Sequence, residues 1–411
     1  MIRVRLCTMM FLEFFIWGGW FVTLGSYLAS TLHASGAQTA LAYSTQSWGA
    51  IIAPFVVGLI ADRYFNAEQL LGAIHIAGAL LLYALYSTRH FQAFYPCVLA
   101  YMILYMPTLA LVNTISFRQM DEPARHFGGV RLWGTIGWIV AGLLISYGFA
   151  WDSHGGIARG LLAKTFLMSA IASLALGLYS FTLPRTPPLR EPGQPPRLAH
   201  LLGLDALALL RHRNFAVFFL ASILICIPLA FYYQNANQFL TEIHVANATG
   251  KQTIGQMSEV AFMLLIPVFL KTFGMKTTLL LGMLAWAARY LLFAFGNAHE
   301  LAFMLIVGIA LHGACYDFFF VSGQIYTDSK AGARHKAAAQ GLITLATYGV
   351  GMLIGFWAAG LIDDRYAAGG AHDWQSIWLF PAGFAAVVFA LFAAAFRNEA
   401  VTYAHARSTP S

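Results

Sequence analysis

Long runs of apolar residues alternate with short polar segments along the whole chain. A helix that crosses a lipid bilayer needs about 20 apolar residues, and the runs match that length. Because backbone polar groups find no water inside a bilayer, each run is expected to be helical. The pattern predicts twelve spanning helices, near residues 7–30, 41–61, 68–88, 94–116, 131–150, 161–183, 215–240, 254–270, 277–296, 300–326, 337–362 and 376–396.

Composition supports the same conclusion. Of the 411 residues, 59% are hydrophobic and only 10% are charged, whereas a soluble domain carries about 25% charged residues. A soluble protein needs a polar surface that this chain lacks, but lipid solvates apolar side chains directly. The sequence therefore predicts an all-α integral membrane protein, and argues against a soluble protein with an oversized core.

Positive charge is distributed unevenly between the predicted loops. Of the 24 Lys and Arg residues, 17 fall on the side that holds both chain ends and 5 fall on the opposite side. Cytoplasmic loops carry such an excess, so both termini are expected in the cytoplasm. The net charge of +7 is thus interpreted as an orientation signal, and no nucleic-acid partner is expected.

One long polar segment, 184–214, divides the predicted helices six and six. It begins with the proline-rich string LPRTPPLREPGQPPR, which disfavours regular structure and indicates a cytoplasmic linker. The string LLGLDALALLRHRN after it fits either a short amphipathic helix on the membrane surface or a plain spacer. The expected organisation is a bundle over 1–183, the linker, and a second bundle with a short cytoplasmic tail over 215–411.

Six helices, a linker and six helices is the plan of the major facilitator superfamily. The loop after the second predicted helix holds Gly58, Asp62 and Arg63 in a G-x-x-x-D-R string, which resembles a signature of that superfamily in the same loop. Glycine permits close helix approach, and a carboxylate can accept from helix N-termini or arginines. These three residues are expected to act in conformational gating.

Ionisable side chains at membrane depth cost at least about 2.5–3.5 kcal/mol, so each needs a reason to be there. The apolar runs contain few of them: Glu13, Arg131, Glu259, Arg289 and Asp317. Transporters of this plan bind substrate near the bilayer midplane, between the two halves. We therefore expect some of these side chains to line a wet passage shared by the bundles.

Two carboxylates are the leading candidates. Gln256 and Glu259 are three residues apart, so they share a helix face and can grip vicinal hydroxyls such as those of ribose. A structural glutamate paired with an arginine is the alternative. Asp317 lies in the apolar string CYDFFF, where burial disfavours the charged carboxylate. Either carboxylate could carry the coupled proton; a permanently neutral, hydrogen-bonded Asp317 is the alternative.

The roles of the remaining candidates are less clearly indicated by their residue types. Arg131, Thr135 and Trp138 form one helical stripe that offers a guanidinium fork, a hydroxyl and a flat aromatic face. An arginine near a helix end can also extend to the membrane surface. Arg289 is expected to be a structural counter-ion or such a surface-reaching residue, and Glu13 to face the cavity or to pair with an arginine.

Seven strings in collinear order carry a more specific resemblance: FFIWGGWFVTLGSY, YMPTLALVNTISF, RLWGTIG, LLGLDALAL, GQMSEVAFML, YDFFFVSGQIY and AAAQGLITL. They resemble the nucleoside:proton symporter family of the major facilitator superfamily over nearly the whole chain. The resemblance implies substrate contacts at Arg131, Thr135, Gln256, Glu259 and Asp317.

It also implies that the base stacks between Trp138 and Tyr316. The chain departs from the family's pattern of substrate contacts in two places. First, some members have Phe where this chain has Trp138. Some members also offer Gln and Asn from the seventh helix where this chain has Ala230 and Tyr233. The preference between purine and pyrimidine bases therefore stays open, with Tyr233 included as a candidate contact.

The sequence thus predicts a secondary active transporter, not an enzyme, that imports nucleosides with protons across the bacterial inner membrane by alternating access. The proton gradient would replace any cofactor, and a monomer is expected. A sugar or oligosaccharide symporter of the same fold is the first alternative. A membrane transferase is a distant one, because the loops show only scattered candidates such as Asp121, His126 and Asp373. A receptor would need an output domain beyond Phe396.

Overall fold

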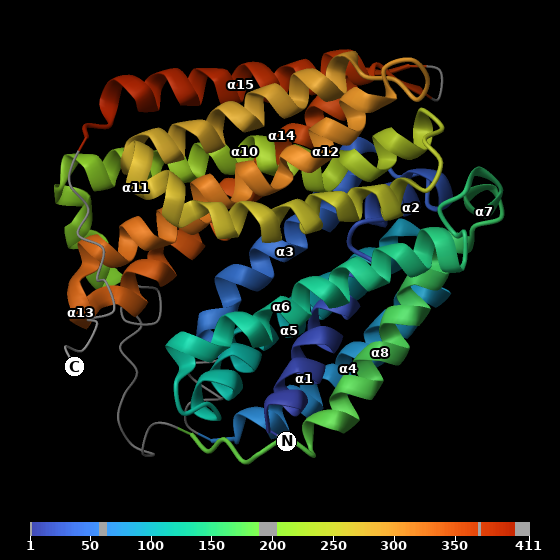
Figure 1. Ribbon diagram of the computed structural model, residues 1–411. Coiled ribbons are helices and arrows are strands. Elements are labelled where there is room, and N and C mark those ends of the chain that lie inside the picture. Colours follow the sequence, from blue (N-terminus) through green and yellow to red (C-terminus); the bar gives the residue numbers. More distant parts are fainter. Residues whose placement is uncertain (1, 57–63, 189–203, 369–370, 399–411) are drawn as a thin grey trace.

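The computed structural model describes residues 2–56, 64–188, 204–368 and 371–398. The first half of the chain forms a bundle of long helices, coloured blue to green in Figure 1. Its elements are α1 (Ile2–Gly18), α2 (Leu24–Thr31), α3 (Gly36–Val56), α4 (Ala67–Ser87), α5 (Phe91–Arg118), α6 (Pro123–Leu143), the π-helical turn η2 (Leu144–Gly148), α7 (His154–Ala158), the short 3-10 helix η3 (Leu161–Ala163) and α8 (Lys164–Ser180).

The second half forms a second bundle beside the first, coloured yellow-green to red in Figure 1. Its elements are the 3-10 helix η4 (Leu204–Arg211), α10 (Arg213–Glu242), α11 (Ala248–Phe295), α12 (Ala302–Tyr316), the π-helical turn η5 (Asp317–Val321), α13 (Ser322–Thr344), the π-helical turn η6 (Leu345–Gly351), α14 (Met352–Arg365) and α15 (Trp374–Ala395). Strands β1 (Ala367–Ala368) and β2 (Ala371–His372) pair antiparallel before α15.

The helices account for the twelve predicted spans. Within the described residues, nine helical segments are long and apolar enough to cross a membrane. One of them, α11, provides two spans, because Gly274 adopts a φ of 77° and a non-helical ψ of 173° inside it. Glycine tolerates this left-handed φ without strain. The remaining two spans are α1 with α2, and α3.

The first span is broken where the sequence predicted one continuous helix. Residues 19–23 form turns between α1 and α2. Two adjacent glycines, Gly18 and Gly19, precede the break, and glycine lowers helix stability by about 1 kcal/mol relative to alanine. Gly18 also packs directly under the ring of Trp138, since a Cβ there would lie 2.8 Å from it. The break thus lies beside a predicted site residue.

The two bundles are joined tightly at the end that holds α2, α7 and the β1–β2 hairpin, which we call the closed end (Figure 1). Each bundle caps a helix of the other with a carboxylate. Asp364 accepts from the backbone amides of Gly36 and Ala37 at the start of α3, at 2.6 and 2.9 Å. Asp152 accepts from the amide of Thr249 at the start of α11, at 2.9 Å. Negative charge is favourable at helix N-termini.

Further contacts seal the closed end. The hydroxyl of Ser26 donates to the side chain of Asn237 at 2.6 Å, and the amide of Gly250 donates to Ser146 at 2.7 Å. Small residues allow the backbones to approach, and a Cβ on Gly36 would lie only 2.3 Å from the carbonyl oxygen of Gly360. The predicted gating residues Gly58, Asp62 and Arg63 lie outside the described residues, as does much of the predicted linker.

Candidate functional site

A cavity lies between the two bundles, below the closed end. Val22, Trp138 and Gly142 line it from the first bundle. The second bundle contributes Tyr232, Tyr233, Thr249, Gln252, Thr253 and Gln256. The structure therefore brings Trp138, Tyr233 and Gln256, three of the predicted substrate contacts, to the wall of one cavity.

Glu259 lies one helical turn beyond Gln256 on α11, and its side chain is 20% exposed. Its Oε1 atom is 3.4 Å from Nε2 of His312 on α12. On the other side of the ring, Nδ1 of His312 is 3.0 Å from Nη1 of Arg289. A guanidinium only donates, so Nδ1 accepts and the ring proton sits on Nε2, directed at Glu259.

Arg289 is completely buried, so the expectation that it reaches the membrane surface is wrong. Its guanidinium carbon lies 3.3 Å from the centre of the Tyr232 ring, in a cation–π contact. The His312 ring stacks on the same tyrosine, with ring centres 5.2 Å apart. Arg289 thus acts as the counter-ion of Glu259 through a histidine, a role nearest to the structural counter-ion expected from the sequence.

Asp317 is completely buried at the start of η5. Neither of its carboxyl oxygens has a hydrogen-bond partner within the described part of the chain. The carboxyl lies close enough to Glu259 for the two to interact electrostatically. Asp317 is therefore not among the residues that line the cavity, although it lies near Glu259.

Arg131 and Thr135 lie on α6, in the first bundle. The Arg131 guanidinium carbon is 4.0 Å from the centre of the Phe14 ring, and it interacts electrostatically with Tyr348 in the second bundle. Tyr348 in turn shares a hydrogen bond of 2.7 Å with the hydroxyl of Tyr316. Thr135 is partly buried. Arg131 of the first bundle thus lies near a pair of hydrogen-bonded tyrosines in the second.

Two rings that line the cavity, Trp138 and Tyr233, pack against further aromatic rings. Trp138 packs edge-on against Trp17, with ring centres 5.5 Å apart. Phe21 of the first bundle meets Tyr233 of the second in the same manner at 6.0 Å. A planar ligand in this cavity would meet flat apolar faces from both bundles, and offset or edge-on ring contacts are favourable.

Sequence reasoning missed His312 and Tyr348. A histidine is mostly uncharged at neutral pH, so it does not stand out as a costly buried charge. One signal was available, since His312 precedes Tyr316 by four residues and so shares its helix face. Tyr348 had no comparable signal, because aromatic residues form 15% of the chain.

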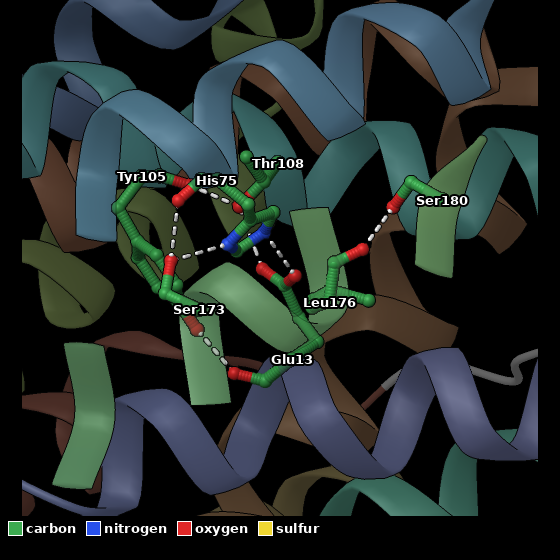
Figure 2. A network of polar contacts seen from close by, with 7 residues as sticks. All are labelled: Glu13, His75, Tyr105, Thr108, Ser173, Leu176 and Ser180. Carbon is green, nitrogen blue, oxygen red and sulfur yellow. Dashed lines mark hydrogen bonds and ion pairs between the residues drawn. The ribbon is translucent and has the colours of Figure 1, made fainter. Parts of the chain in front are cut away.

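Among the residues that the structure describes, Glu13 neither lines the cavity nor pairs with an arginine, so both of these expectations are wrong. It is completely buried within the first bundle. Figure 2 shows its carboxylate beside the ring of His75, with 2.9 Å between Oε2 and Nε2. A second histidine was therefore missed for the same reason as the first.

The chain matches a known family over almost its whole length. A family model described as nucleoside H⁺ symporter matches residues 1–401. The chain belongs to the nucleoside:proton symporter family. This family comprises transporters, not enzymes, as the sequence predicted.

Two relatives of this symporter come from Escherichia coli strain K12. The putative nucleoside transporter YegT is 42% identical over 403 residues, covering 96% of this chain and 94% of YegT. Xanthosine permease is 34% identical over 406 residues, covering 95% of each chain. A crystal structure of a mutant of nucleoside transporter NupG matches with a TM-score of 0.88 at 30% identity, covering 97% of this chain and 100% of that one. The symporter thus has the expected major facilitator fold and is a multi-pass membrane protein.

Proposed function

We propose that this symporter imports nucleosides together with protons across the bacterial inner membrane by alternating access. The observation that carries the proposal is the cavity shared by the two bundles. It combines a stacking face, Trp138, with an amide, Gln256, and a partly exposed carboxylate, Glu259, lies one turn away. Family membership and the relatives' names favour nucleosides over sugars as the cargo.

In this proposal the ribose hydroxyls bind between Gln256 and Glu259. The carboxylate accepts hydrogen bonds and the amide both donates and accepts, which matches a pair of vicinal hydroxyls. The base stacks near Trp138 and Tyr316, and Tyr233 forms part of the cavity wall beside it. Arg131 and Thr135 supply further donors from the first bundle.

The coupled proton binds Asp317 or Glu259. Two carboxyls that interact in a poorly hydrated site do not both ionise readily, so one of them holds a proton while substrate is bound. Energy comes from the proton gradient, about 2.3 kcal/mol per charge per 100 mV plus the pH term. No bound cofactor is required.

The uneven distribution of Lys and Arg supports an orientation with both termini in the cytoplasm. The closed end then faces the outside. Gly58, Asp62 and Arg63 would act as a gate on the cytoplasmic side. We propose a monomer organised as bundles over 1–183 and 215–411, joined by the cytoplasmic linker 184–214, with no nucleic-acid partner.

Uptake of labelled uridine and adenosine into proteoliposomes tests the proposal. We expect saturable uptake of at least one nucleoside, accelerated when the outside is made acidic, and little competition by free sugars. Absence of saturable nucleoside uptake would contradict the substrate assignment. An uptake rate that does not change with the pH gradient would contradict proton coupling. Strong competition by a disaccharide would favour the sugar alternative.

A further inference from the structure

A second buried polar network lies inside the first bundle and contains none of the residues that line the cavity (Figure 2). The hydroxyl of Thr108 on α5 donates to Glu13 Oε1 at 2.6 Å. His75 on α4 contacts Glu13 Oε2 through Nε2 at 2.9 Å and Ser173 Oγ through Nδ1 at 3.1 Å. Four helices, α1, α4, α5 and α8, therefore meet at one carboxyl and one imidazole.

The hydrogen bonds fix where the protons are. Ser173 uses its single hydroxyl proton on the carbonyl oxygen of His75, at 2.8 Å. Its oxygen must therefore accept from Nδ1 of His75, which places a proton on that nitrogen. The contact between Nε2 and Glu13 Oε2 then requires one more proton, carried either by the ring or by the carboxyl. Without that proton, a lone pair and a carboxylate oxygen would face each other at 2.9 Å.

Loss of this proton to water would leave a neutral imidazole and a carboxylate with no cation bonded to it. Glu13 is completely buried, and an unpaired charge is very unfavourable in such surroundings. The other titratable or charged groups described around Glu13 are Tyr101 and Tyr105 on α5 and Arg131 on α6, while α8 contributes Ser173. Release therefore requires α1 and α4 to separate far enough to admit water.

Such a movement would reach the cavity. Trp17 follows Glu13 by one helical turn on α1, and its ring contacts both Tyr105, at 5.7 Å, and Trp138, at 5.5 Å. Tyr105 also donates to the backbone carbonyl of Glu13 at 2.7 Å. The network thus holds the part of α1 that supports the stacking face.

We propose that Glu13 and His75 form a second proton-binding site, distinct from Glu259 and Asp317, whose occupancy favours the conformation that is shut at the closed end. This inference rests on the proposed proton-coupled transport and adds a second site in the other bundle. Proton binding that differs between two conformations shifts the equilibrium between them. The ligand is the proton itself, and its release to the cytoplasm would let the empty carrier return to the conformation that is open at the closed end.

The Glu13→Gln variant separates proton binding from packing. A glutamine amide donates to Nε2 of neutral His75 and its oxygen accepts from Thr108, so it reproduces the loaded network but cannot release a proton. Glu68→Gln is the matched control, because Glu68 is also buried in this bundle and accepts from the backbone amide of Thr186 at 2.8 Å. His75→Gln is a second variant, which removes the imidazole and leaves only the Glu13 carboxyl able to bind a proton.

Infrared difference spectra of the purified protein between acidic and alkaline pH measure the site directly. We expect titrating imidazole or carboxyl bands that are altered or lost in Glu13→Gln, imidazole bands that are lost in His75→Gln, and no change in Glu68→Gln. If one variant fails to fold, the other decides. If the folded variants gave the same difference spectrum as the unchanged protein, the inference would be overturned.

Transport supplies the second readout. In Glu13→Gln, we expect uridine accumulation driven by a pH gradient to fall by about fivefold or more, the lower end of typical coupling between sites. Uridine exchange at equal pH on both sides should stay near that of the unchanged protein. Wild-type accumulation in this variant would overturn the inference. Absence of nucleoside transport in the unchanged protein would instead overturn the proposed function. The infrared experiment would still test whether Glu13 and His75 bind a proton.

Discussion

At the scale of single residues, Arg289 is linked to Glu259 by His312, which contacts both side chains. The guanidinium is buried against Tyr232 and donates to one ring nitrogen, while the other ring nitrogen faces Glu259. A hydrogen bond to a charged group contributes about 1.5–3 kcal/mol. The orientation of the Glu259 carboxylate therefore depends on a side chain that need not touch the substrate.

Replacing His312 with phenylalanine tests this dependence. The ring can still stack on Tyr232, but Arg289 loses its acceptor and Glu259 its donor. We expect the KM for uridine to rise by about tenfold, which corresponds to about 1.4 kcal/mol, in a proteoliposome uptake assay. His299→Phe, at an exposed position, is the control. An unchanged KM in His312→Phe would show that the relay does not orient Glu259.

A different histidine predicts a pH dependence of stability. His372, in β2 outside the spanning helices, donates from its backbone amide to Glu242 Oε1 at 2.8 Å and contacts Oε2 through Nδ1 at 2.9 Å. The hydrogen bond to Glu242 raises the pKa of His372 above its ordinary value of 6.5. The pair therefore contributes fully below pH 6.5, and its contribution disappears as pH rises through the raised pKa.

Thermal unfolding in detergent across that pH range measures the contribution. We expect His372→Gln to unfold at a lower temperature than the unchanged protein in acid, and the two to converge as the pH becomes alkaline. His90→Gln, at an exposed position, should follow the unchanged protein at every pH. A difference that grows with pH would contradict the assignment.

Sequence analysis identified charged residues far better than neutral polar ones. Glu259, Asp317 and Arg289 stood out because an ion in an apolar run needs an explanation. Their partners did not, since a histidine is not a permanent charge and both His312 and His75 occur in apolar strings. Pairings such as Glu13 with His75 join helices 62 residues apart in the chain, and no local spacing indicates them.

At the scale of elements, two helix N-termini hold the bundles together at the closed end. Asp364 of the second bundle caps α3, and Asp152 of the first bundle caps α11. Each carboxylate gains from the partial positive charge of the helix it caps. Because both contacts cross between bundles, both must break when the closed end opens.

The Gly36→Ala variant tests how closely these helices must approach. A Cβ on Gly36 would lie 2.3 Å from the Gly360 carbonyl oxygen, whereas one on Gly155 would have nothing within 4 Å. Overpacking costs about 1–3 kcal/mol, enough to shift the balance between conformations by roughly tenfold.

The readout is the reactivity of a cysteine at the cavity position Thr253, in a protein without other cysteines. We expect a reagent applied from the closed end to react faster in Gly36→Ala, and at the original rate in Gly155→Ala. Equal rates in both variants would show that this contact does not hold the end shut.

The sequence predicted the number of spans but not their irregularities. Apolar runs define spans because lipid thickness sets their length. The break at 19–23 and the π-helical turns η2, η5 and η6 depend on packing against neighbouring helices, which a single run does not encode. One of these irregularities begins at Asp317, so a predicted site residue lies where local prediction is weakest.

At the scale of the whole molecule, composition and the division into six and six helices were sufficient to predict the fold. The major facilitator arrangement follows from two apolar bundles joined by one polar segment. Which end is closed could not be predicted, because both conformations of an alternating-access transporter use the same helices and spans. That information comes from the contacts between bundles, such as those of Asp364 with the start of α3.

The central claim is that both bundles hold one nucleoside between them. Uridine binding to the purified protein and to two variants, Trp138→Ala in the first bundle and Gln256→Ala in the second, tests it most directly. Loss of base stacking costs about 1–3 kcal/mol, and loss of a hydrogen-bonding partner costs a similar amount. We predict that each variant binds uridine at least about fivefold more weakly, and unchanged affinity in either variant would contradict a site shared by the two bundles.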